Sequence, residues 1–121
     1  MSAGLRLWAA MLVAHSAAAQ SLPQVVIQTS LGSIAVEVDT VSAPITGLNF
    51  LRYVDQGSYR GARFHRTVRP DNQPDNQVKI EVIQGGPDPR RSKDAAAIPL
   101  ERTSETGLSH QDGTISMARD G

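Results

Sequence analysis

Two short stretches near residue 30 combine β-branched residues with an alternation of apolar and polar positions. Residues 24–29 are rich in valine and isoleucine, and residues 33–39 place an apolar side chain at every second position from Ile34 onward. A period of two is typical of a half-buried strand. Residues 30–32, Ser-Leu-Gly, supply a turn between the two stretches. The pattern therefore predicts a β-hairpin.

A helical pattern with marked ends follows the hairpin. Ser42 is a plausible N-cap, Pro44 suits the first turn because its missing N–H costs little there, and Gly57 suits the C-terminal end. The apolar stripe of this helix comprises Ile45, Leu48, Leu51 and Tyr53/Val54. We expect this stripe to pack against the end of a β-barrel.

The middle of the chain predicts two more strands, at residues 63–68 and residues 78–84. Residues 69–77 lie between them and contain a near-duplicated Asp-Asn-Gln together with proline. Such polar, proline-containing composition favours an exposed loop. The two strands are therefore expected to be neighbours joined by this loop.

The last third of the chain predicts shorter elements. Residues 85–97 mix glycine, proline and charge and indicate a long loop. Residues 98–101 predict a short edge strand, because the proline at position 99 cannot donate to a ladder. Asp112-Gly113 marks a turn before a fifth strand at residues 114–118. Five strands and one helix give a mainly β fold with an early α-helix.

The first nineteen residues have the pattern of a signal peptide. Arg6 precedes an apolar run at residues 7–14, and Ser16-Ala17-Ala18-Ala19 offers a small-x-small cleavage site. The run is too short to cross a bilayer, which needs about 20 residues. The alternative is an uncleaved N-terminal helix. Cleavage near residue 19 would release residues 20–121 as one domain into the periplasm or the medium, with no attachment to the membrane.

Composition narrows the classes of partner. The 121 residues carry 12 Lys/Arg and 12 Asp/Glu, so the net charge is zero and offers no concentrated basic face for nucleic acid or an anionic membrane. Arginines recur at positions 60, 63, 66 and 69, but a strand would divide them between two faces. The chain has no cysteine, which excludes disulfides and lipid attachment through cysteine.

Metal, nucleophile and phosphate chemistry have little support in the sequence. The three histidines lie at positions 15, 65 and 110, without the ligand spacing of a zinc site. Spacing does not exclude a Ser-His-Asp triad, but no Gly-x-Ser-x-Gly elbow is present. Gly85-Gly86 lacks the Lys-Ser/Thr of a phosphate loop. We therefore expect no metal and no cofactor.

Three blocks occur in a fixed order along the chain. They are Phe64-His65-Arg66, then Gln84-Gly85-Gly86 eighteen residues after Arg66, then the segment Gly113-Thr114-Ile115-Ser116-Met117-Ala118-Arg119. Together they resemble the front half of a cyclophilin, the β-barrel family of peptidyl-prolyl isomerases. The resemblance covers Val25 to Gly121. It implies a cyclophilin-like antiparallel β-barrel that is incomplete where the sequence stops, and a parent protein that is active although the isolated piece lacks part of the pocket.

The resemblance also implies a set of site residues. By this likeness Arg66 contacts the substrate proline, and Gln84 hydrogen-bonds the substrate backbone and helps to hold Arg66. The groove would be lined by Phe64, His65, Val82, Ala118 and Arg119. From its strand position alone, with Phe64 expected on the same face and His65 on the other, Arg66 would be an ordinary surface arginine.

The implied activity is acceleration of rotation about X–Pro peptide bonds in proline-containing segments of unfolded or folding proteins. The alternative is a cyclophilin-like module that binds such segments without catalysis. Glu81 favours this alternative, because many cyclophilins place an aromatic residue three positions before the glutamine. A secreted β-domain with neither property is a third possibility.

Overall fold

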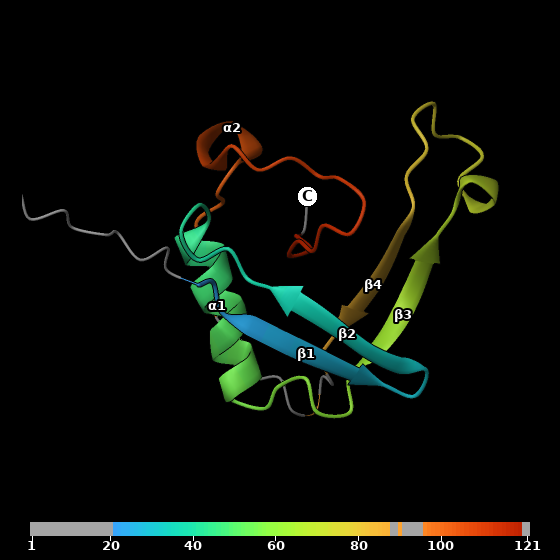
Figure 1. The fold of residues 1–121 in the computed structure, drawn as a ribbon. Coiled ribbons are helices and arrows are strands. Elements are labelled where there is room, and N and C mark those ends of the chain that lie inside the picture. The colour runs from blue at the N-terminus through green and yellow to red at the C-terminus, as the bar shows by residue number, and fades with distance from the viewer. Residues whose placement is uncertain (1–20, 88–89, 91–95, 120–121) are drawn as a thin grey trace, which may run out of the picture.

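The computed structural model of the chain describes residues 21–87, 90 and 96–119. In these residues, strands outnumber helices and form two antiparallel hairpins (Figure 1). The elements are β1 (Gln24–Thr29), β2 (Gly32–Glu37), α1 (Pro44–Asp55), β3 (Arg63–Val68), the 3₁₀ turn η1 (Pro70–Asn72), β4 (Val82–Gly86) and α2 (Thr103–Thr106). The predicted signal peptide, residues 1–19, lies outside the described residues.

The predicted first hairpin is confirmed. β1 and β2 pair without interruption from Gln24 opposite Glu37 to Thr29 opposite Gly32. The Thr29 hydroxyl fixes the turn, because it donates to the Gly32 carbonyl at 2.8 Å and accepts from the Leu31 N–H at 3.1 Å. The alternating apolar residues of the second strand were expected to be buried, and only some of them are. Val36 and Val38 are buried, whereas Ile34 is 41% exposed.

Helix α1 is confirmed with Pro44 in its first turn. At its C-terminal end Gly57 has a φ of +69°, and the N–H groups of Gly57 and Ser58 donate to the carbonyls of Val54 and Tyr53. This is the Schellman arrangement that favours glycine. The described residues form no barrel end for the apolar stripe to pack against, and Ile45 and Leu48 are 42% and 58% exposed.

The N-terminal cap of α1 differs from the prediction. The N-cap residue is Ala43, which has no capping side chain, and the N–H of Ser42 instead donates to Asp39 Oδ1 at 2.7 Å. Glu101 takes over the capping role from a distant part of the chain. Its Oε1 accepts from the Ile45 N–H at 3.1 Å, and its Oε2 accepts from the Thr46 N–H at 2.7 Å. These N–H groups have no partner within the helix, so the carboxylate satisfies them.

Two carboxylates at this helix end make stability depend on pH. The Ser42 N–H lowers the pKa of Asp39 below its ordinary 3.8. Desolvation acts to raise the pKa of Glu101, but hydrogen bonds from Thr46 and Ile45 outweigh it, so that pKa lies below 4.5. A carboxylate whose pKa is lower in the folded than in the unfolded state stabilises the fold at pH values above its unfolded-state pKa. This stabilisation is lost as the pH falls through the pKa of the folded state.

We therefore expect the melting temperature to fall on acidification below about pH 4. Thermal unfolding followed by circular dichroism at a series of pH values measures this effect. Glu101→Gln should unfold at a lower temperature near neutral pH and should lose part of the pH dependence. An unchanged pH dependence in this variant would show that the Glu101 carboxylate does not stabilise α1.

The second hairpin is formed by β3 and β4. β3 has the predicted bounds, but β4 begins at Val82 and ends at Gly86, so the prediction of a strand from residue 78 is wrong. The side chain of Gln73 explains the late start. It donates to the Ile80 carbonyl at 2.6 Å and accepts from the Ile80 N–H at 3.3 Å. These backbone groups are thereby unavailable to a strand ladder.

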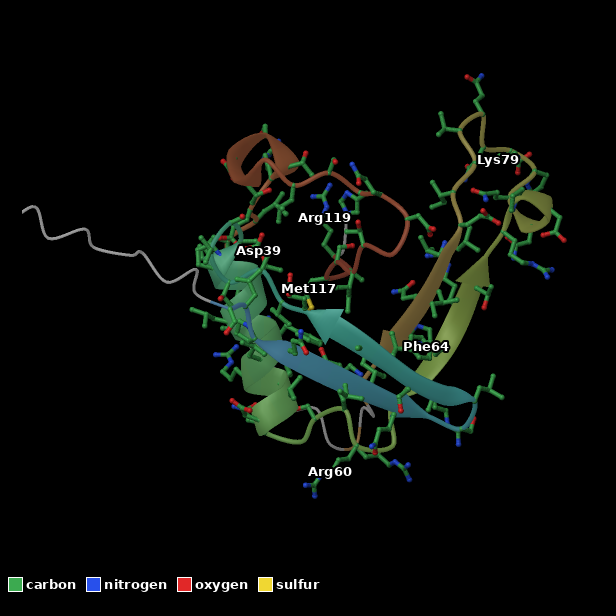
Figure 2. The ribbon with its side chains drawn as sticks, in the orientation of Figure 1. Asp39, Arg60, Phe64, Lys79, Met117 and Arg119 are labelled. Carbon is green, nitrogen blue, oxygen red and sulfur yellow. The ribbon has the colours of Figure 1, made fainter. Side chains whose placement is uncertain are left out.

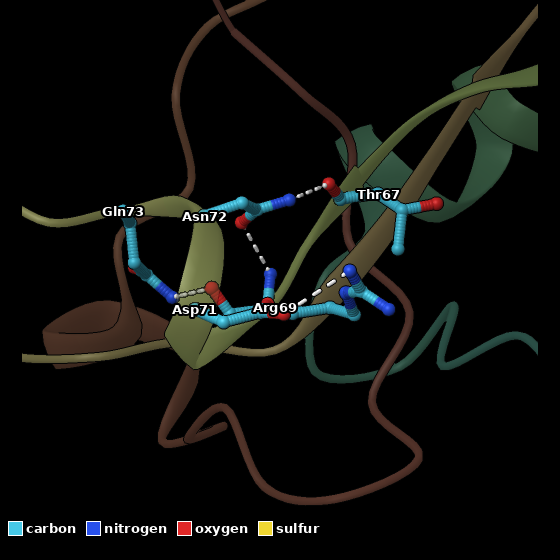
Figure 3. Close-up of polar contacts among 5 residues, drawn as sticks. All are labelled: Thr67, Arg69, Asp71, Asn72 and Gln73. Carbon is cyan, nitrogen blue, oxygen red and sulfur yellow. Dashed lines mark hydrogen bonds and ion pairs between the residues drawn. The ribbon is translucent and has the colours of Figure 1, made fainter.

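The loop between β3 and β4 is more ordered than its composition indicates (Figure 3). Asn72 accepts from the Arg69 N–H at 2.8 Å and donates to the Thr67 carbonyl at 2.9 Å. Gln73, only 7% exposed, also donates to the Arg69 carbonyl at 2.9 Å and accepts from Asn76 at 3.2 Å. Two donors and two acceptors are all that a glutamine amide offers. Its hydrogen-bonding capacity is therefore fully used.

The last third of the described chain departs most from the prediction. Residues 98–101 and 114–118 are irregular, so the edge strand and the fifth strand are wrong. A strand needs a partner for its ladder, and neither segment pairs with a described strand. The short helix α2 was not predicted. The turn at Asp112-Gly113 is confirmed, with Gly113 at a φ of +80°.

No closed barrel forms among the described residues, because the two hairpins belong to separate two-stranded sheets. Burial is correspondingly limited, and the buried apolar side chains are Val36, Val38 and Val68. The described part of the chain contains no helix of the length and apolar character needed to span a membrane.

Candidate active site

Arg66 and Gln84 meet across the second hairpin. Arg66 lies on β3 directly opposite Gln84 on β4, and Arg66 Nη1 donates to Gln84 Oε1 at 3.2 Å. Arg66 is exposed and Gln84 is half-buried. The expectation that these two side chains lie together on neighbouring strands is therefore confirmed.

A β-bulge at His65 sets the faces of this hairpin. Phe64 pairs with Gly85 and Arg66 pairs with Gln84, so β3 advances two residues while β4 advances one. Directly opposed residues share a face, and successive residues of β4 alternate. Phe64 and Arg66 therefore lie on opposite faces. The prediction that they share one face is wrong, because it assumed an unbroken alternation.

The glycines of β4 locate the two aromatic side chains of the Phe-His-Arg block. A Cβ placed on Gly85 would lie 3.0 Å from Phe64 Cδ1, whereas a Cβ placed on Gly86 would lie 3.7 Å from His65 Cε1. Gly86 shares a face with Gln84 by alternation. His65 is thus on the side of Gln84, and the prediction that it lies opposite Arg66 is also wrong.

Apolar side chains extend the face that carries Arg66 and Gln84. Val82 lies two residues before Gln84 and pairs with Val68, so alternation places both valines on this face. Val82 is 43% exposed and Val68 is buried. Val68 was not proposed for the site, although its position two residues after Arg66 was a usable signal.

An open groove of about 280 Å³ lies at the loop end of the second hairpin. Its lining residues are Thr67, Val68, Arg69, Glu81, Val82 and Ile83. Arg69 forms an exposed ion pair with Asp71 at 3.2 Å (Figure 3). Arg66, by contrast, makes no ion pair within the described residues. Its positive charge is therefore not neutralised by a carboxylate of this part of the chain.

Ala118 and Arg119 lie on the irregular segment that follows the turn at Gly113. Both are exposed, and no hydrogen bond or ion pair joins them to Arg66 or Gln84 among residues 21–87 and 96–119. Figure 2 shows Met117 and Arg119 on this segment and Phe64 on the second hairpin. The structure thus brings together two blocks of the predicted site, and the third lies on a separate segment.

The described residues contain no cluster of side chains suited to binding a metal ion. Among the residues that the structure describes, no group of three or more histidine, cysteine, aspartate or glutamate side chains could hold an ion. His65 and His110 are both exposed. The hairpin presents a guanidinium, a carboxamide, the imidazole of His65 and apolar neighbours.

Comparison with known proteins identifies relatives of the chain by sequence. Residues 24–121 match the family described as "Cyclophilin type peptidyl-prolyl cis-trans isomerase/CLD". The chain is 33% identical over 104 residues to a peptidyl-prolyl cis-trans isomerase of Acinetobacter baylyi, covering 86% of this chain and 50% of that protein. It is 34% identical to peptidyl-prolyl cis-trans isomerase A of Dickeya dadantii, covering 84% and 49%.

A third relative is peptidyl-prolyl cis-trans isomerase cyp18 of Streptomyces antibioticus, 35% identical over 77% of this chain and 51% of that protein. The chain thus spans about half the length of these curated relatives. No solved structure matches it significantly.

Proposed function

Because the chain belongs to the cyclophilin-type peptidyl-prolyl cis-trans isomerase family, we propose that the full-length protein accelerates rotation about X–Pro peptide bonds. The observation that carries this proposal is the contact of Arg66 Nη1 with Gln84 Oε1 at 3.2 Å on an accessible face of the hairpin. The substrates are proline-containing segments of unfolded or folding proteins.

The chemistry follows from the electronic structure of the amide. Resonance opposes rotation about the C–N bond with a barrier of about 18–20 kcal/mol. When the bond twists, the proline nitrogen recovers its lone pair and becomes a hydrogen-bond acceptor. A donor aimed at this nitrogen or at the twisted carbonyl stabilises the perpendicular geometry more than either planar one.

Each side chain of the face has a part in this mechanism. Arg66 donates to the twisting bond, and it suits the task because its planar guanidinium remains charged. Gln84 holds the guanidinium through its Oε1 and keeps its amide N–H₂ for the substrate backbone. Val82, which is exposed, offers the proline ring an apolar surface, and the buried Val68 lies opposite it on β3. We assign His65 to the edge of the same face. Phe64 lies on the opposite face, so we assign it a packing role against Gly85 of β4.

The runner-up function is binding of proline-containing segments without catalysis. Glu81 favours it, because this exposed carboxylate lines the groove next to Val82 where the resemblance implies an aromatic wall. The two functions are separated by two measurements on the full-length protein. An isomerase shortens the relaxation time of a cis/trans proline peptide at substoichiometric concentration. A binder shows peptide affinity and leaves the relaxation time unchanged.

We further propose that the protein is exported and assists folding in the periplasm or the medium. The charged, apolar and small-residue regions of residues 1–19 support this proposal. Expression of the full-length gene in a bacterium, followed by N-terminal sequencing of the exported fraction, should find a start at Gln20. Retention in the cytoplasm with Met1 intact would contradict it.

The finer architecture is also a proposal. We propose that both hairpins are parts of an antiparallel β-barrel in the full-length protein, with α1 at one end. The exposed apolar side chains of the hairpins, among them Val26 and Ile83, support this because a barrel would cover one face of each. Hydrogen exchange in the full-length protein should then protect both edges of each hairpin, and rapid exchange along an edge would contradict a closed barrel.

A further inference from the structure

One side chain accepts the hydrogen bonds that connect the last described segment with residues 21–87. Residues 96–119 and residues 21–87 are connected by two hydrogen bonds, both accepted by Glu101, from the N–H groups of Ile45 and Thr46. Every other hydrogen bond that residues 96–119 form with the described part of the chain stays within that segment, as in α2 and the turn at Gly113. Within the described residues, Glu101 is therefore the sole hydrogen-bonded link between the two parts.

The geometry of this link favours a firm attachment. Both carboxylate oxygens are used, each by a different backbone N–H, at 3.1 Å and 2.7 Å. The donors belong to the first turn of a twelve-residue helix, α1, whose N-terminus carries the positive end of the helix dipole. Charge-assisted hydrogen bonds of this kind are stronger than neutral ones. A bidentate acceptor also fixes the orientation of the backbone that carries it.

The backbone held in this way leads to the third block of the candidate site. From Glu101 the chain forms α2 (Figure 1), turns at Gly113 and continues to Ala118 and Arg119. Arg119 is labelled on this segment in Figure 2. We propose that Glu101 is a positioning residue, which fastens this segment to the N-terminus of α1 and thereby presents Ala118 and Arg119 to the substrate. The inference rests on the proposed function for its kinetic readout, and its structural readout is independent of that function.

The test compares Glu101→Ala with wild type in the full-length protein. Loss of the link should leave the segment in the binding geometry for only a fraction of the time, which weakens apparent affinity by that fraction. We expect KM for a proline peptide to rise about 3- to 10-fold. kcat should change less than twofold, because Arg66 and Gln84 lie on the separate β3–β4 hairpin. Glu101→Gln keeps the side-chain length and one acceptor, so its rise in KM should be smaller.

Glu105→Ala is the matched control. Glu105 also caps a helix with its carboxylate, which accepts from the Arg102 N–H at 2.9 Å, but this bond stays within the segment. Its KM should equal that of the wild type. A melting temperature lowered by Glu101→Ala with KM unchanged would assign Glu101 a purely stabilising role and overturn the proposal.

Amide hydrogen exchange separates this inference from the proposed function. In Glu101→Ala, the amides of Ile45, Thr46 and residues 107–119 should exchange faster than in the wild type. If the wild-type protein shows no isomerase activity, the proposed function fails, and faster exchange would still support the link. Equal exchange in both proteins overturns the link, whatever the activity.

Discussion

Arg66→Ala in the full-length protein is expected to lower kcat/KM for X–Pro isomerisation by roughly 10²- to 10³-fold, the effect of removing one preorganised donor from a transition state. The reason is that the Arg66 guanidinium is the charged donor on the face of Gln84 and Val82, and no carboxylate of the described residues neutralises it. A protease-coupled or NMR exchange assay with a proline peptide measures the change.

Two further variants make this result specific. Arg66→Lys keeps the positive charge but loses the planar fork, so it should recover only a small part of the lost rate. Arg60→Ala removes an exposed arginine of the loop before β3 and should leave the rate unchanged. If Arg66→Ala retains the wild-type rate, Arg66 is not catalytic and the assignment of the site is wrong.

Gly85→Ala should destabilise the second hairpin by about 1–3 kcal/mol, the usual cost of overpacking. The added methyl group would lie 3.0 Å from Phe64 Cδ1 and 3.2 Å from the Arg63 carbonyl oxygen. The backbone oxygen has little room to move because β3 and β4 are paired at this point. We expect a lower midpoint in denaturant unfolding of the full-length protein, together with reduced isomerase activity.

The adjacent glycine provides the control for this substitution. A Cβ on Gly86 would lie 3.7 Å from His65 Cε1, which is an ordinary contact. Gly86→Ala should therefore leave the free energy of unfolding unchanged or raise it by up to ~1 kcal/mol, since alanine loses less entropy in a strand. Equal destabilisation by both substitutions would show that Phe64 does not pack against Gly85.

Elements whose signals are local were predictable from the sequence. The β1–β2 hairpin and the bounds of β3 follow from short-range alternation, and Gly57 marks the end of α1 through its own backbone preference. The start of β4 was missed because the side chain of Gln73 takes the backbone groups of Ile80. Gln73 lies seven residues before Ile80, so its competition for these backbone groups leaves no mark on the alternation of apolar and polar residues in the strand.

In the candidate site, too, some features could be predicted from the sequence and others could not. The pairing of Arg66 with Gln84 was predictable, because the resemblance names both residues and a hairpin brings their strands together. The faces of Phe64 and His65 were not, because a single bulge reverses the parity of a strand without changing its composition. Glu101 was missed as a cap because its partners precede it by more than 50 positions.

The distance between Glu101 and α1 has a consequence for synthesis on the ribosome. Thr46 and Glu101 are 55 positions apart, so at about 5–20 residues per second roughly 3 to 11 s pass between their incorporation. During that interval the nascent helix exposes two N–H groups that only water can satisfy. The β1–β2 hairpin depends on neighbours already translated, so it can form before the helix terminus is complete. During synthesis, the capping of the first turn of α1 therefore cannot be completed before residue 101 has been added.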